Sequence, residues 1–198
     1  MKQFANAITS FLLDEKIIEI DELEIYRYGT EQILINFMVF GSISIVAAIY
    51  NLWIATISMF VGFMPIRMIA GGYHANTIRK CNILTFSVYI SNMFAIQKLR
   101  DEITYPQFGM LCLITVILIF LFAPVDHRNR EIRKEKKEHV KRYSKVIATV
   151  LATFSIIMVA VSNEIDIIPL GTMMGAFTAS VSLFIGSIKR RRERNEET

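Results

Sequence analysis

Cysteine and N-terminal basic residues are scarce in this chain, and each scarcity excludes a class of protein. Only two cysteines, Cys81 and Cys112, occur in 198 residues, so no disulfide framework is expected. The first 30 residues carry several acidic side chains and lack a basic segment followed by an apolar core, which argues against a signal peptide. Insertion into a membrane is therefore expected to rely on internal segments.

Charged side chains are absent from residues 33–66, and 53% of the chain is hydrophobic, with a mean hydropathy of +0.42. These values are typical of membrane proteins. As one helix, residues 33–66 would be about 50 Å long, whereas a bilayer's hydrocarbon core is about 30 Å thick. We therefore expect two spans that turn near residues 50–53. Four further spans are predicted at residues 82–97, 107–125, 146–162 and 167–188.

The fold class predicted from these patterns is all-α: a polytopic membrane protein with about six transmembrane helices and an N-terminal amphipathic helix. The amphipathic helix is indicated by Phe4, Ile8, Phe11 and Leu12, which recur at helical spacing. It would lie on the inner membrane surface or, alternatively, pack on a partner subunit or substrate. We expect a single integral-membrane domain, with an interfacial segment at 1–30, a transmembrane region at 33–188 and a basic-to-acidic tail at 189–198.

The basic residues predict the orientation. All of them except Lys98 and Arg100 fall in segments that face the cytoplasm if both termini do so. We therefore expect a multi-pass cell-membrane protein with both termini on the cytoplasmic side. The net charge of +4 is explained by these anchors, and no nucleic-acid partner is expected. The mixed-charge segment at 128–145 is interpreted as a solvated helix extending from the fifth span, or as a contact for phospholipid or an acidic substrate.

The residues that suggest chemistry lie between the second and third spans. The segment Arg67-Met-Ile-Ala-Gly71-Gly72-Tyr-His74 is followed by Cys81. An imidazole within reach of a thiol can take its proton and make it a nucleophile. In an unbroken helix, positions 74 and 81 would lie about 10.5 Å apart along the axis, too far for such a dyad. Gly71-Gly72 weakens the helix before His74 and permits a turn. Judged from the residues alone, a Cys–His dyad and a purely structural role remain equally open.

Arg67 and the other histidines also allow more than one interpretation. Arg67 would extend to the lipid headgroups, pair with a buried carboxylate, or bind a substrate carboxylate or carbonyl. His127 and His139 are not well spaced for a metal site, so neither a metal nor a cofactor is expected.

The pattern Arg67-x-x-x-Gly71-Gly72-Tyr73-His74-Ala75 with Cys81 resembles the signature of the AgrB family, the membrane peptidases of Gram-positive quorum sensing. Two other stretches are similar to the family's pattern, at residues 24–29 and at residues 123–126 with Asn129. Asn129 is followed by Arg-Glu where many members have Lys-Pro.

The resemblance implies a cysteine endopeptidase with Cys81 as nucleophile and His74 as base, both on the cytoplasmic side. Its substrate would be an AgrD-like propeptide, cut before its acidic tail through a thioester and then cyclised to a thiolactone or lactone. Arg67, Gly71, Gly72 and Asp126 would bind substrate or support the site, and Asp126 is a candidate third catalytic member. The resemblance also implies a homodimer in the lipid bilayer.

Two rival functions and one structural question remain open at this stage. The chain would alternatively be a non-enzymatic transporter or peptide-export scaffold, although its spans lack a charged relay. A narrower rival is a peptidase that hydrolyses its thioester. Gly171, Gly175 and Ala179 recur at four-residue spacing and offer a close-packing face, used either between subunits, within the chain or toward lipid.

Overall fold

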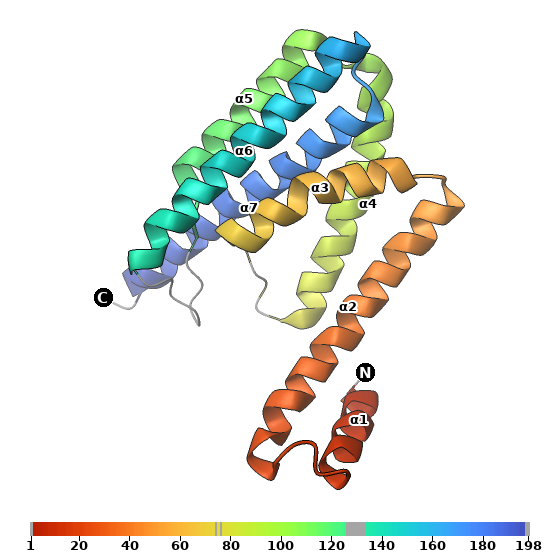
Figure 1. Cartoon of the computed structure of the whole chain (residues 1–198), viewed down its shortest axis with the longest axis vertical. Coiled ribbons are helices and arrows are strands. Elements are labelled where there is room, and N and C mark those ends of the chain that lie inside the picture. Colours follow the sequence, from red (N-terminus) through yellow and green to blue (C-terminus); the bar gives the residue numbers. More distant parts are fainter. Residues whose placement is uncertain (1, 74, 76, 126–133, 197–198) are drawn as a thin grey trace. The chain divides into compact units, whose positions relative to one another are not determined.

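The computed structural model describes residues 2–73, 75, 77–125 and 134–196, and within these ranges it contains helices and no strands (Figure 1). The all-α class expected from the sequence is therefore confirmed. The chain forms two compact units, Met1–Asn51 and Leu52–Thr198, each of which is described separately.

The first unit contains helices α1 and α2, joined through a short 3-10 helix. Its elements are α1 (Lys2–Asp14), η1 (Ile20–Glu22) and α2 (Leu23–Ile49). Helix α1 packs on α2, with Ala5 and Thr9 buried. Phe4 and Phe11 are 70% and 60% exposed, so the apolar side of the expected amphipathic helix is uncovered.

The second unit is a helical bundle built around its last helix. Its elements are α3 (Trp53–Ala70), α4 (Ile78–Glu102), α5 (Tyr105–Phe122), α6 (Lys134–Ser162) and α7 (Ile167–Glu196). Helix α7 contacts each of the other four, and Figure 1 shows it running beside α5 and α6 and crossing α3. Leu170, Met173 and Leu183 on α7 are fully buried. Helix α7 is thus the core of this unit.

The closest helix packing joins α3 to α7. A Cβ atom added at Gly175 would lie 2.0 Å from the carbonyl oxygen of Met59, and one at Gly62 would lie 1.9 Å from that of Thr172. Ala179 is 1% exposed. The small-residue stripe on α7 is therefore used inside the chain, where it lets two backbones approach. Its interpretation as a subunit interface is wrong for this face.

One end of the bundle brings together the ends of α3 and α5 and the middle of α7. The amide of Val125, just after α5, donates to the carbonyl of Ala70 at the end of α3, at 3.0 Å. Near the same end, Arg67 on α3 bonds to Ser182 on α7 at 3.0 Å. Helices α3, α5 and α7 thus run in the same direction.

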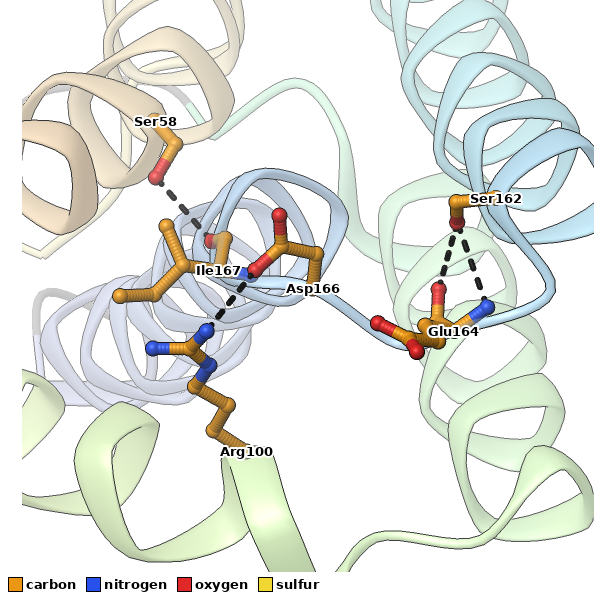
Figure 2. Close-up of polar contacts among 6 residues, drawn as sticks. All are labelled: Ser58, Arg100, Ser162, Glu164, Asp166 and Ile167. Atoms are coloured by element: carbon orange, nitrogen blue, oxygen red, sulfur yellow. Dashed lines mark hydrogen bonds and ion pairs between the residues drawn. The ribbon is translucent and has the colours of Figure 1, made fainter.

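The other end of the bundle is tied by polar contacts at the start of α7, shown in Figure 2. Arg100 near the end of α4 pairs with Asp166 at 3.5 Å, and Ser58 on α3 donates to the carbonyl of Ile167 at 3.4 Å. Tyr105, the first residue of α5, bonds through its hydroxyl to the carbonyl of Asn163. Helix α4 therefore begins at the first end and finishes at the second.

Five helical segments in the described ranges are long and apolar enough to cross a membrane. They are Ile20–Ile49, Trp53–Ala70, Tyr105–Phe122, Lys137–Ser162 and Ile167–Glu193. Helix α4 is not among them, yet it carries the chain back from the end of α3 to the start of α5. Its more polar composition has a structural use. Tyr89 shares a buried hydrogen bond with Thr56 at 2.9 Å, and Asn92 accepts a part-buried one from Thr178 at 3.0 Å. Helix α4, where the sequence predicts a span at residues 82–97, therefore runs along the bundle without being one of the five candidate spans.

Candidate active site

The helix is interrupted between Arg67 and Cys81, as the sequence predicts. Helix α3 ends at Ala70, and α4 begins at Ile78. Gly71 and Gly72 have φ angles of +78° and +132°, which side chains other than hydrogen rarely permit. The two glycines therefore end α3 and start the loop that leads to α4.

Arg67 holds this loop in place. Its guanidinium donates to the carbonyl of Gly71 at 3.2 Å, to the carbonyl of Tyr73, and to the hydroxyl of Ser182 at 3.0 Å. The last carbonyls of a helix have no partner within it, and a basic side chain in the last turn can bond to them. Arg67 thus turns back onto the loop and does not extend to headgroups, and among the described residues no carboxylate pairs with it. Its donors support the backbone of the candidate site.

Tyr73 is fastened to α7 through its main-chain amide and its ring. Its amide donates to the carbonyl of Ser182 at 2.9 Å and to the Ser182 hydroxyl at 3.1 Å. The ammonium of Lys189 lies 5.2 Å from the centre of the Tyr73 ring, within cation–π range. A Cβ atom at Gly186 would lie 2.8 Å from the Tyr73 amide nitrogen, so the missing side chain of Gly186 makes room for the loop.

Cys81 lies in the first turn of α4. Thr77 is the N-cap, and its hydroxyl accepts from the amide of Lys80 at 3.4 Å. The amide of Cys81 donates to the carbonyl of Thr77 at 3.0 Å. The positive end of a helix favours a nearby anion, and the Arg67 guanidinium lies close enough to Cys81 for electrostatic interaction.

The two cysteines occupy different environments. Cys81 is partly exposed, whereas Cys112, in the middle of α5, is only 3% exposed. Cys112 is thus a small buried residue of the bundle. In the part of the chain that the structure describes, no three His, Cys, Asp or Glu side chains gather as metal ligands.

His74 and Asp126 lie outside the described residues, so the His74–Cys81 distance is not assigned. Their neighbours in the chain are placed. Tyr73 is held by Arg67 and Ser182, as described above. The carbonyl oxygen of Val125 would lie 2.9 Å from a Cβ at Gly71, so the segment that leads to Asp126 passes close to the loop.

The sequence matches the family model of Accessory gene regulator B, AgrB, over residues 5–179. The chain belongs to the AgrB family. Membership implies a role in processing a quorum-sensing propeptide, and the family is generally one of cysteine proteases. A multi-pass membrane protein is consistent with both the family and the apolar helices.

Several curated proteins described as AgrB-like are similar to this AgrB-family chain. One from Listeria monocytogenes serotype 4b is 24% identical over 173 residues, covering 86% of this chain and 82% of its own. One from Listeria innocua is 24% identical, with the same shares covered. A Clostridium perfringens protein is 26% identical over 133 residues, covering 64% of this chain and 62% of its own. No solved structure is significantly similar to the chain.

Two residues of the site were not identified from the sequence, Ser182 and Gly186. Both lie beyond residue 179, where the AgrB family match ends. A signal for them was present, because they continue the small-residue stripe of α7 at helical spacing. Only the folded chain shows that this end of the stripe meets Arg67 and Tyr73.

Proposed function

We propose that this chain is a membrane-embedded cysteine endopeptidase that removes the C-terminal tail of an AgrD-like propeptide and cyclises the remainder to a thiolactone or lactone. Cys81 is the nucleophile and His74 is its base. The observation that carries the proposal is the helix break at Gly71–Gly72, which is braced by Arg67. The same guanidinium lies within electrostatic range of the Cys81 thiol.

The chemistry proceeds in two acyl transfers. His74 takes the thiol proton of Cys81, and the sulfur attacks the carbonyl carbon of the peptide bond before the tail. That bond breaks, the tail leaves with its amino group protonated by His74, and the propeptide stays bound as a thioester. A thiol or hydroxyl within the propeptide then attacks the thioester carbonyl. The ring closes, and Cys81 is released as a thiol.

The fixed backbone on either side of the loop suits this reaction. Tyr73, which precedes the proposed base, is bonded to α7 through its amide and to Arg67 through its carbonyl. The amides of Tyr73 and Cys81 are both already bonded within the chain, to Ser182 and Thr77. Donors for the oxyanion of the transition state are therefore expected at other amides of the loop or of the first turn of α4.

The remaining elements of the proposal concern sidedness, substrate capture and assembly. Both termini and the site face the cytoplasm, as the distribution of basic residues predicts. Arg191 and Arg192 are exposed on the last turns of α7, beyond the Lys189–Tyr73 contact, and suit an acidic propeptide tail. The whole chain acts as one peptidase domain and works as a homodimer. Crosslinking in native membranes is expected to give a dimer band, and a monomer that still processes propeptide would contradict the dimer.

Mass spectrometry of a co-expressed propeptide tests the reaction. The wild-type chain is expected to give a released tail and a product one water lighter than the linear peptide. With Cys81→Ala, the propeptide should remain intact, while the protein still inserts into the membrane. A linear product without the tail would support the peptidase and contradict the cyclisation. Tail release by Cys81→Ala at the wild-type rate would disprove the nucleophile.

A further inference from the structure

Ser182 stands out among the serines of α7 because its hydroxyl contacts another part of the chain. Serine hydroxyls in a helix usually bond back to a carbonyl one turn earlier. Ser180 and Ser187 do so, to Phe177 and Phe184 at 2.7 and 2.8 Å. The Ser182 hydroxyl instead accepts from the Arg67 guanidinium at 3.0 Å and from the Tyr73 amide at 3.1 Å.

These two contacts make Ser182 the link between α7 and the candidate site. Arg67 has two other acceptors, the carbonyls of Gly71 and Tyr73, but both belong to the loop that Arg67 itself supports. Ser182 is its acceptor on a separate helix. Helix α7 is the core of the bundle, so the hydrogen bond to Ser182 anchors the Arg67 guanidinium to a rigid element.

The space around Ser182 leaves little freedom for the guanidinium. A Cβ atom at Gly72 would lie 2.2 Å from the Arg67 Nη1 atom and 2.8 Å from the Ser182 Oγ atom. The loop backbone therefore lies against both groups. A buried or half-buried arginine in a membrane-spanning segment also needs satisfied donors, because no bulk water replaces a lost acceptor there.

We infer that Ser182 is a positioning residue for the peptidase, which holds the Arg67 guanidinium against the Gly71–Tyr73 loop and fixes Tyr73, the residue before His74. The inference rests on the function proposed above only in taking Cys81 as the reacting thiol. Ser182 lies beyond residue 179, outside the region that matches the AgrB family. The role is therefore assigned from the contacts of this chain alone.

Charge-selective alkylation of Cys81 tests the position of the guanidinium without any propeptide. The full-length Cys112→Ala protein, reconstituted in liposomes, is treated with iodoacetate, which is anionic, and with iodoacetamide, which is neutral. Both reagents react with the same thiolate, so the ratio of their rates reports the local charge and not the thiolate fraction. The Arg67 guanidinium interacts electrostatically with Cys81, so holding it in place raises this ratio because it attracts the anion. Arg67→Gln gives the ratio without that charge.

Ser182→Ala is expected to lower the iodoacetate-to-iodoacetamide ratio about threefold, toward the value of Arg67→Gln. Ser180→Ala is the matched control, because Ser180 is buried on the same helix and its hydroxyl bonds to Phe177 of that helix. Its ratio should equal that of the parent protein. An unchanged ratio in Ser182→Ala would overturn the inference.

A second pair of variants separates the hydroxyl from simple packing. Ser182→Thr keeps the hydroxyl, whereas Ser182→Val introduces a side chain of the same shape as threonine but without the hydroxyl. Thr is expected to retain the parent ratio and Val to lose it, and equal ratios in the two would overturn the inference. Cleavage of propeptide is then compared, with kcat expected to fall more than KM changes in Ser182→Ala. A lowered ratio with normal cleavage would leave Ser182 as the anchor of Arg67 and count against Cys81 as the reacting thiol.

Discussion

The hydroxyl groups of Thr56 and Tyr89 lie 2.9 Å apart in a buried hydrogen bond between α3 and α4. Helix α4 contacts α3 and α7 less extensively than α7 contacts α3. The few polar bonds along its length therefore matter for its position. Because Cys81 lies in the first turn of α4, the placement of this helix decides where the thiol sits relative to Arg67.

Replacing Tyr89 with Phe is expected to lower the free energy of unfolding by about 1 kcal/mol, the upper part of the range for a hydrogen bond between membrane helices. Denaturation in mixed micelles measures this change. Tyr143→Phe is the control, since Tyr143 is 60% exposed on α6. Thr56→Val should lower the free energy of unfolding less in the Tyr89→Phe protein than in the wild type, because the hydrogen bond between the two hydroxyls is already lost. Fully additive effects would show that the two hydroxyls do not interact.

Replacing Gly175 with Ala is expected to destabilise the fold by about 1–3 kcal/mol, because the new Cβ would overlap the Met59 carbonyl. Thermal unfolding in detergent measures the effect. Gly109→Ala is the matched control, since no atom lies within 4 Å of a Cβ at that position in α5. Loss of a dimer band without loss of stability would instead place Gly175 at a subunit interface.

Replacing Gly72 with Ala is expected to reduce propeptide cleavage at least tenfold, roughly the effect of 1.4 kcal/mol on the barrier. Its Cβ would displace the Arg67 guanidinium, and its φ of +132° is unfavourable for alanine. Gly41→Ala, at an open position on α2, should cleave normally. The same propeptide assay compares the two variants, and equal rates would show that the close contact between Gly72 and Arg67 does not matter for activity.

Replacing Cys112 with Ala is expected to leave propeptide cleavage within about twofold of wild type, because a buried cysteine behaves as a small apolar residue. Maleimide labelling of the native protein should modify Cys81, which is partly exposed, much faster than Cys112, which is 3% exposed. Cleavage that depends on Cys112 and survives Cys81→Ala would reverse the two assignments.

The sequence alone determined the class of the protein and predicted where its candidate site lies. Long apolar segments predict membrane helices because an unpaired backbone is costly in lipid. The helix break before His74 follows from Gly71-Gly72, since a local conformational preference acts within a few residues. The ends of α3 and α4, at Ala70 and Ile78, agree with that prediction.

Only the tertiary structure decided which groups meet at the site. Arg67 and Ser182 are 115 residues apart in the chain, and no local pattern couples them. The stripe of Gly171, Gly175 and Ala179 shows that α7 packs closely against something, but small side chains do not specify the partner helix. That choice depends on the complementary surface, which Gly62 and the neighbouring residues of α3 provide. Helix α4 does not have a purely apolar pattern, for a related reason. Its polar side chains bond to partners on other helices, which become neighbours only when the chain folds.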